Sequence, residues 1–190
     1  MTAAAAFFSA LMAPDTQAVA RGLRRRDPEL LDGLIEQYQY RLYRYLLYLT
    51  GSAEAAEDLF QETWIRVLER GHQYDGQSKF ETWLFAIARH LTIDLARRKR
   101  PDGMNMLSEE PAAAGVSAFD QVSSQETKAQ IQARLGQVPA VYREVLLLRF
   151  QEEITLEEIG AVLGTPLSTV KSRLYRGLDA LRALFAEEPR

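Results

Sequence analysis

The sequence contains no cysteine and only two histidines, His72 and His90, among 190 residues. The missing thiols exclude disulfides, thiolate metal sites and a cysteine nucleophile. Two histidines are too few for a typical histidine-rich metal cluster. No nucleophile–base pair, phosphate-cradling glycine loop or metal-ligand spacing is recognisable. We therefore expect no enzymatic activity, no catalytic residues, no metal and no cofactor, and the composition fits the reducing cytoplasm.

The sequence also lacks an apolar run long enough to cross a membrane. It opens with the apolar letters MTAAAAFFSALMA, which carry no positive charge of the kind that begins a signal peptide. We interpret residues 1–20 as an apolar tail that is frayed or forms a short packing helix, with contact to a partner as the alternative. No membrane insertion is expected.

A strongly basic composition is missing as well, since 23 Lys and Arg stand against 26 Asp and Glu for a formal net charge of −3. This balance argues against a uniformly basic nucleic-acid binder. The cations are unevenly distributed, however, and gather in RGLRRR at 21–26 and RRKR at 97–100. Local basic patches of this kind can still attract phosphate.

Helical periodicity is what the sequence has in abundance. Apolar residues recur every three or four positions over 29–50, 53–70, 80–100, 124–135, 139–150 and 155–182, and no stretch alternates as a strand would. Residues 101–122 show no period, contain proline and glycine, and have no lysine or arginine. We therefore predict an all-α fold of two small helical domains, 21–100 and 123–190, joined by a flexible linker at 101–122.

Helix ends are marked by capping residues. Asp27-Pro28 is typical of a cap followed by a first helical turn, and Gly51-Ser52 predicts the end of one helix and the cap of the next. Gly164 predicts a helix end with left-handed backbone. We expect Thr165 to cap the helix that follows, with Pro166 in its first turn.

The segment Thr155–Arg182 is predicted to form two helices joined by a tight turn. The second helix has one apolar face, and polar residues lie opposite it or at its edges: Ser168, Thr169, Lys171, Ser172, Tyr175 and Arg176. Such a helix suits a DNA major groove. Turn geometry alone is weak evidence, so taken by itself the segment favours an ordinary helical hairpin with a solvated basic face.

Two further helices carry polar faces. The helix at 53–70 presents Asp58, Gln61 and Glu62, a face that DNA would repel and that is either solvated or made for a basic protein partner. The helix at 80–100 has an apolar stripe and an outward side with Arg89 and His90. Its predicted buried residues are Phe80, Trp83, Leu84, Ile87, Ala88, Leu91 and Leu95. Helical spacing leaves His90 equally compatible with an exposed polar role and with a base or phosphate contact.

Four stretches occur in an order that resembles one protein family. They are AEDLFQETWIRVL at 56–68, YDGQSKFETWLFAIARHLTIDLARRKR at 74–100, QVPAVYREVLLLRF at 137–150 and ITLEEIGAVLGTPLSTVKSRLYRGLDALR at 154–182. Together they resemble the extracytoplasmic-function (group 4) sigma factors of the sigma-70 family, the promoter-specificity subunits of bacterial RNA polymerase. The resemblance covers residues 28–185 and reverses the preference for an ordinary hairpin.

The resemblance implies a role for each polar face. In the family, the first motif docks on the clamp coiled coil of core polymerase, which would assign that role to Asp58, Gln61 and Glu62. The second domain would meet the polymerase flap and read the minus-35 element with the six polar residues of the last helix named above. The resemblance further implies an anti-sigma partner and a monomeric free chain in the cytoplasm.

The loop at 71–79 and the helix after it would recognise and melt the minus-10 element, where the family flips a nontemplate base into a protein pocket. The residues expected to do so are Tyr74, Asp75, Gly76, Gln77, Ser78, Arg89, His90, Arg97 and Arg98, with Arg100 as a further phosphate contact. The sequence departs from the family at His90, where asparagine is expected. It also departs at Gly177-Leu178-Asp179, where Ala-Arg-Glu is more frequent and where a glycine weakens the helix by roughly 1 kcal/mol.

Two other functions remain open at this point. One is a sigma mimic that binds anti-sigma factors without reading DNA, although a mimic need not keep the basic residues Lys171, Arg173 and Arg176. The other is a stand-alone helix-turn-helix repressor, against which the large tryptophan-containing first domain and its acidic face argue.

Overall fold

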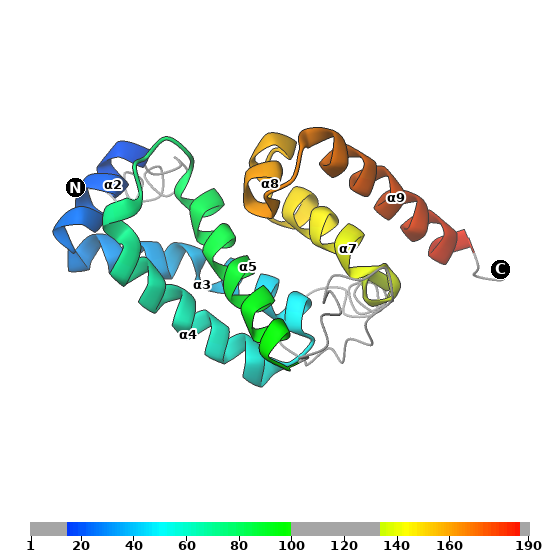
Figure 1. Ribbon diagram of the computed structural model, residues 1–190, viewed down its shortest axis with the longest axis horizontal. Helices are drawn as coiled ribbons and strands as arrows, with labels where there is room; N and C mark the ends of the chain where they lie inside the picture. Colours follow the sequence, from blue (N-terminus) through cyan, green and yellow to red (C-terminus); the bar gives the residue numbers. More distant parts are fainter. Residues whose placement is uncertain (1–14, 100–133, 187–190) are drawn as a thin grey trace, which may run out of the picture.

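The computed structural model describes residues 15–99 and 134–186, and within these ranges the chain is helical with no strand (Figure 1). Helices α2–α5 form a first group and α7–α9 form a second. This arrangement confirms the predicted all-α fold class with two helical regions. The predicted linker at 101–122 lies outside the described residues, as does the apolar tail up to residue 14.

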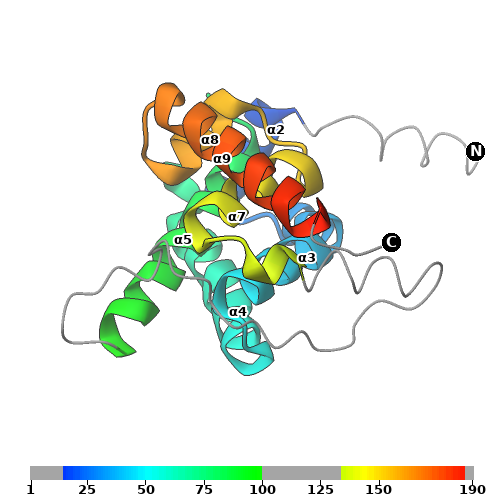
Figure 2. The ribbon, with the colours of Figure 1, turned by 90° about the vertical axis from the view of Figure 1, so that its right-hand side faces the viewer.

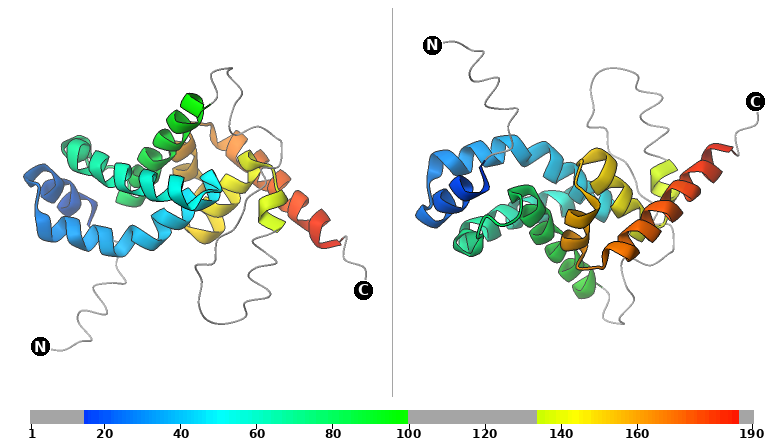
Figure 3. Two further views of the ribbon diagram at one scale, coloured as in Figure 1. Left: turned by 90° about the horizontal axis from the view of Figure 1, so that it is seen from below. Right: turned by 90° about the horizontal axis from the view of Figure 1, so that it is seen from above.

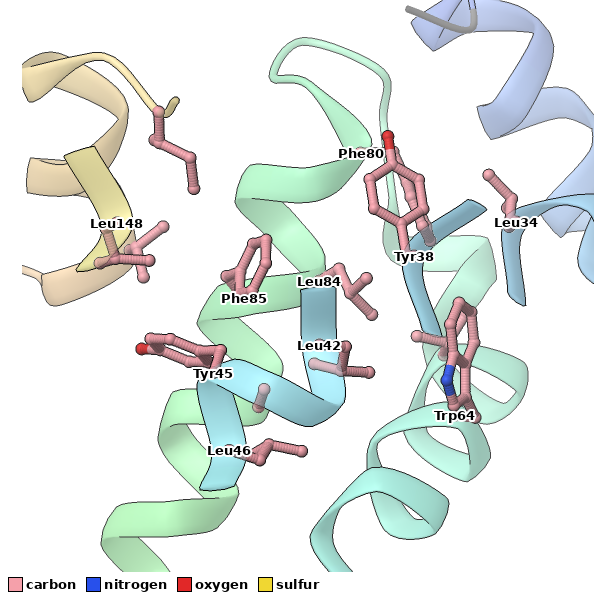
Figure 4. Close-up of a cluster of buried hydrophobic side chains, with 14 of the residues drawn as sticks. Leu34, Tyr38, Leu42, Tyr45, Leu46, Trp64, Phe80, Leu84, Phe85 and Leu148 are labelled. Atoms are coloured by element: carbon pink, nitrogen blue, oxygen red, sulfur yellow. The ribbon is translucent and has the colours of Figure 1, made fainter. Parts of the chain in front are cut away.

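The first group contains α2 (Thr16–Arg25), α3 (Pro28–Thr50), α4 (Ala53–Arg70), a short 3-10 turn η1 (Gly71–Gln73) and α5 (Phe80–Lys99). Helix α3 packs against both α4 and α5. Figure 4 shows the core between these helices, which is formed by Leu34, Tyr38, Leu42, Tyr45, Leu46, Trp64, Phe80, Leu84 and Phe85. Phe85 is fully buried although it lies outside the predicted stripe of α5.

The predicted caps of α3 and α4 are confirmed. Asp27 Oδ1 accepts hydrogen bonds from the backbone N–H groups of Glu29 and Leu30 at 3.1 and 3.4 Å, and Pro28 is the first helical residue. Gly51 ends α3 with a φ of +65°, and the Ser52 hydroxyl accepts from the first turn of α4.

The second group contains α7 (Ala140–Leu146), a π-helical turn η2 (Leu147–Gln151), α8 (Leu156–Leu163) and α9 (Leu167–Ala186). The prediction of one regular helix over 139–150 is therefore wrong in its second half, where the hydrogen bonds widen. The backbone N–H of Glu152 bonds the Leu147 carbonyl at 3.1 Å, and Glu153 follows with a φ of +56°. This turn leaves the Glu152 side chain facing the protein interior.

Helix α8 begins with a reciprocal capping box. The Thr155 hydroxyl accepts from the Glu158 backbone N–H, while the Glu158 carboxylate accepts from the Thr155 backbone N–H. Burial alone would raise the pKa of Glu158, but hydrogen bonds from Thr155 and Lys79 outweigh it and lower this pKa. Gly164 ends α8 with a φ of +61°, as predicted. The cap predicted for Thr165 is wrong, because its buried hydroxyl has no hydrogen-bond partner in the described part of the chain.

The two groups contact each other directly, with α5 packed against α8. Figures 2 and 3 show the second group lying against the first from three further directions. The hydrophobic core continues across this contact, where Leu148 of η2 lies opposite Phe85 and Tyr45 (Figure 4). The two groups therefore share one buried interior in this structure.

Candidate functional site

The loop between η1 and α5 is anchored by Tyr74. Its side chain is only 2% exposed, and its ring packs against Phe80 and Trp83 with centroids 5.8 and 5.3 Å away. Burial raises the pKa of Tyr74 to about 12, so the hydroxyl stays protonated. That hydroxyl donates a hydrogen bond to the Ser78 carbonyl. Tyr74 was predicted to offer a polar group to a base, but in this structure its hydroxyl is already engaged inside the loop.

The exposed polar side chains of the loop are those of Asp75, Gln77 and Ser78. Asp75 Oδ1 accepts a hydrogen bond from the Gln77 backbone N–H at 2.9 Å, which closes a local turn. Gly76 lies between these residues with a φ of +75°, a backbone conformation that other residues rarely adopt. The loop thus combines a fixed backbone with unburied polar groups.

Helix α2 supports this loop from the side, and sequence reasoning missed that contact. The Gln17 amide donates to the carbonyls of Asp75 and Gly76 at 3.3 Å each. A side chain added at Gly76 would lie 2.9 Å from Gln17 Nε2 and from the Thr16 carbonyl oxygen. Gly76 is therefore required both by its φ and by the close approach of α2. No apolar period marks this contact, because it is made by one amide and backbone atoms.

The four predicted DNA contacts on α5 are not equivalent. His90, Arg97 and Arg98 are exposed, whereas the Arg89 side chain is only 11% exposed. Arg89 Nε donates to Glu144 Oε1 of α7 at 2.9 Å. The structure therefore places Arg89 inside the contact between the two helical groups. Arg100 lies outside the described residues.

The same contact contains two buried glutamates that sequence reasoning did not single out. Glu144 is 1% exposed and accepts from both Arg89 and the Tyr45 hydroxyl, each at 2.9 Å. Burial raises the pKa of Glu144, against the opposing effects of Arg89 and Tyr45. The Glu152 side chain is fully buried and lies 2.8 Å from Arg41 and 3.3 Å from Arg44. A charged residue inside the apolar run VYREVLLL was the available signal.

The acidic face predicted on α4 borders a groove. Asp58 and Gln61 are exposed, and Glu62 is partly buried and paired with Arg66 at 2.9 Å. Asp58 and Glu62 line a groove of about 490 Å³ between α4 and the C-terminal half of α5, where Leu91 and Leu95 supply apolar surface. An open groove with carboxylates at its edge and leucines at its base suits a basic amphipathic helix better than a small molecule.

The polar residues predicted on α9 share its solvent side. Ser168, Lys171, Ser172, Tyr175 and Arg176 are exposed, and Thr169 is partly buried. Val170, on the opposite side, is fully buried against the core. Arg176 Nη1 reaches the Tyr142 hydroxyl of α7 at 3.4 Å. Helices α8 and α9 with their short turn thus form a helix-turn-helix whose second helix presents hydroxyls, a ring and cations.

Gly177 of α9 has a structural reason that the sequence did not reveal. A side chain at this position would lie 3.1 Å from Leu146 and 3.3 Å from Tyr142, because α7 crosses α9 there. The glycine allows the two helices to approach closely. Its expected cost to helix stability is thereby offset by packing.

Within the described ranges, no cluster of His, Cys, Asp or Glu is arranged to hold a metal ion. No helix in the same ranges is long and apolar enough to cross a membrane. The polar surfaces described above are therefore the features that carry function. An all-helical chain with an acidic groove, a glycine-dependent polar loop and a helix-turn-helix belongs to the class of helical DNA-binding proteins that also dock on another protein.

Comparisons with known proteins identify the family. Residues 34–101 match the family Sigma-70 region 2, and residues 128–181 match Sigma-70, region 4. Over 171 residues the chain is 35% identical to the ECF RNA polymerase sigma factor SigW of Bacillus subtilis (strain 168), a match that covers 84% of this chain and 91% of SigW. It is also 35% identical over 167 residues to SigE of Mycolicibacterium smegmatis, covering 82% and 62% of the two chains.

Solved structures with the same fold include CnrH in complex with the cytosolic domain of CnrY, with a TM-score of 0.69, 19% identity and coverage of 92% and 99%. The sigma factor RpoE of Bartonella quintana in complex with the anti-sigma factor NepR gives a TM-score of 0.62, 21% identity and coverage of 83% and 98%. The chain therefore belongs to the ECF sigma factors of the sigma-70 family, and its function is promoter recognition in transcription initiation.

Proposed function

We propose that this sigma factor docks on core RNA polymerase through α4, melts and reads the minus-10 element with the loop and α5, and reads the minus-35 element with α9. The helix-turn-helix carries the proposal, because its capped first helix and the exposed polar face of α9 suit insertion into a major groove. The chain acts as a binding subunit and not as an enzyme. We place the two domains at 21–100 and 123–190, with the linker at 101–122.

At the minus-10 element, the loop supplies edge-reading groups. Asp75, Gln77 and Ser78 are exposed on a backbone that Tyr74 and Gln17 hold in place, which suits capture of a flipped base. Arg97 and Arg98 lie exposed at the end of α5, where they bind phosphates and add affinity with little sequence information.

At the minus-35 element, Ser168, Thr169, Lys171, Ser172 and Tyr175 contact the major groove or its phosphates together with Arg176. Replacing Arg176 by alanine is expected to weaken initiation at minus-35-dependent promoters by about 1–3 kcal/mol, because a base-reading guanidinium contributes about this much. The measurement is open-complex formation over a promoter library with core polymerase.

The matched control for Arg176→Ala is Arg182→Ala, which removes the same charge from the same helix. Arg182 is exposed and pairs with Asp179 at 2.9 Å, away from the turn. An equal loss for both variants, or an unchanged promoter profile for Arg176→Ala, would remove Arg176 from the reading face.

We also propose that the chain has an anti-sigma partner, acts in the cytoplasm, where the chromosome lies, and is a monomer when free of core polymerase. The support for a partner is that two proteins with the same fold were solved in complex with the cytosolic domain of CnrY and with the anti-sigma factor NepR. The flap of core polymerase is the proposed contact of the second domain.

The test of the whole proposal is in vitro transcription with core polymerase on a promoter library. We expect initiation that depends on both the chain and core polymerase. Absence of core-dependent initiation on every sequence, with retained binding to an anti-sigma protein, would show a sigma mimic. Tight specific binding to duplex DNA without polymerase would show a repressor.

A further inference from the structure

The contact between the two helical groups is sorted by charge. The first group contributes the cations Arg41, Arg44, Lys79 and Arg89, and the second contributes the carboxylates Glu144, Glu152 and Glu158. We call this set of residues the seam. The ion pairs run from Lys79 at the start of α5, 3.2 Å from Glu158, to Arg89 further along the helix. Complementary charges of this kind specify one mutual orientation.

The central members of the seam are buried. The Glu152 side chain accepts from Arg41 Nε at 2.8 Å, and Arg41 Nη2 donates to the Glu152 backbone carbonyl at 2.7 Å. Glu144 holds Arg89 and Tyr45 on one carboxylate oxygen. Its other oxygen and Arg44 Nε are buried with no hydrogen-bond partner in the ranges that the structure describes. A buried ionic contact that is only partly satisfied fixes geometry but contributes little net stability.

This closed arrangement is incompatible with binding both promoter elements. Their names place them about 25 base pairs apart, which is roughly 85 Å along straight DNA at 3.4 Å per base pair. Helix α8 packs directly on α5. Helix α9, with 20 residues, extends only about 30 Å from the turn that joins it to α8. The two groups must therefore separate before α5 and α9 can reach their elements together.

The seam also occupies part of the minus-10 surface. Arg89 lies on α5, the helix proposed to follow the minus-10 strand, and its side chain is bound to Glu144. A guanidinium nitrogen that donates to a buried carboxylate is not available to a phosphate. The carboxylates of the second group thus stand where DNA phosphates would stand, and the two ligands exclude each other.

We propose that the basic side of α3 and α5 is a docking surface for the second helical group of the same chain, and that Glu144 and Glu152 latch the free chain in a closed form that cannot engage a promoter. Core polymerase opens the latch by binding the groups apart. This inference rests on the proposed role of α5 and α9 in DNA binding. It adds a state of the free protein that precedes promoter recognition.

The test measures the distance between the two groups in the full chain. Because the sequence has no cysteine, Gln37→Cys on α3 and Ala183→Cys on α9, both exposed, give unique positions for spin or fluorescent labels. The test variant is Glu144→Gln with Glu152→Gln, which keeps side-chain shape. The control is Glu153→Gln with Glu157→Gln, two exposed residues of the same segment with the same change in charge.

We expect the closed population to fall about tenfold in the test variant and to stay unchanged in the control, with equal helix content by circular dichroism. Binding of the free protein to a fork-junction minus-10 oligonucleotide should rise about tenfold in the test variant only. Core polymerase should lengthen the distance in the wild-type chain. An unchanged distance in the test variant overturns the latch, and opening without a gain in DNA affinity overturns the competition for Arg89. Loss of core-dependent transcription in every variant, with the distance changes intact, would instead contradict the proposed function.

Discussion

Replacing Asp58 and Glu62 together by lysine is expected to weaken binding to core RNA polymerase on the order of 1000-fold, ~4 kcal/mol, while leaving the fold intact. Both carboxylates line the groove between α4 and α5. Their reversal places two like charges against the basic coiled coil that the family docks there, and such like-charge contacts cost several kcal/mol. Asp58 is exposed, so its side chain carries little folding energy.

The local cost of the double substitution is small. Glu62 pairs with Arg66 one turn away, and a lysine there exchanges an attractive i,i+4 pair for a repulsive one, at about 0.5 kcal/mol. The matched control is Asp32→Lys with Glu36→Lys, two exposed carboxylates with the same spacing on α3. Affinity is measured by fluorescence anisotropy with purified core polymerase. Equal weakening by the control would show a nonspecific charge effect and would remove the groove as the docking site.

Helix boundaries and exposed faces were predictable because they depend on local sequence. Asp27, Gly51 and Gly164 stand where capping chemistry demands them, and the structure confirms each. The polar residues of α9 were found for the same reason, since a helix with one apolar face fixes what lies opposite. The acidic face of α4 followed from the same argument.

The features that sequence reasoning missed arise between elements distant along the chain. Phe85 and Arg89 lie off the main apolar stripe of α5 and are buried near a second packing partner that periodicity does not reveal. Glu144 pairs with Arg89 across 55 residues, and Glu152 with Arg41 across 111. The π-helical turn that orients Glu152 has no simple sequence signal. Long-range charge pairing thus needed the structure.

The predicted base-capturing loop illustrates the same division. Its polar, turn-rich composition indicated an adaptable loop, but the structure shows a backbone held from both sides. Tyr74 anchors it from the core, and Gln17 holds two carbonyls from α2 across 58 and 59 residues. Residues 15–33 precede the matched family region at 34–101, so nothing in that match identifies Gln17. A prearranged loop has less conformational entropy to lose when it captures a base.

Replacing Gly76 by alanine is expected to reduce promoter opening on the order of 100-fold while core binding is retained. Left-handed backbone at φ +75° costs a residue with a Cβ roughly 1–2 kcal/mol. The new Cβ would also meet the Thr16 carbonyl oxygen at 2.9 Å, and a backbone atom cannot move aside as a flexible side chain can. The loop must therefore leave its seat on α2. The measurement is permanganate reactivity of unpaired thymines at the minus-10 element.

The matched control for this substitution is Gly33→Ala on the exposed side of α3, where nothing lies within 4 Å of the added Cβ. That change should stabilise the helix by about 0.5–1 kcal/mol and leave opening unaffected. A template with a premelted minus-10 region should restore initiation by Gly76→Ala in large part, because the deficit lies in capturing the first base. If the premelted template restores nothing while core binding is normal, the loop acts after melting. If Gly76→Ala opens promoters at the wild-type rate, the seat on α2 is not needed for base capture.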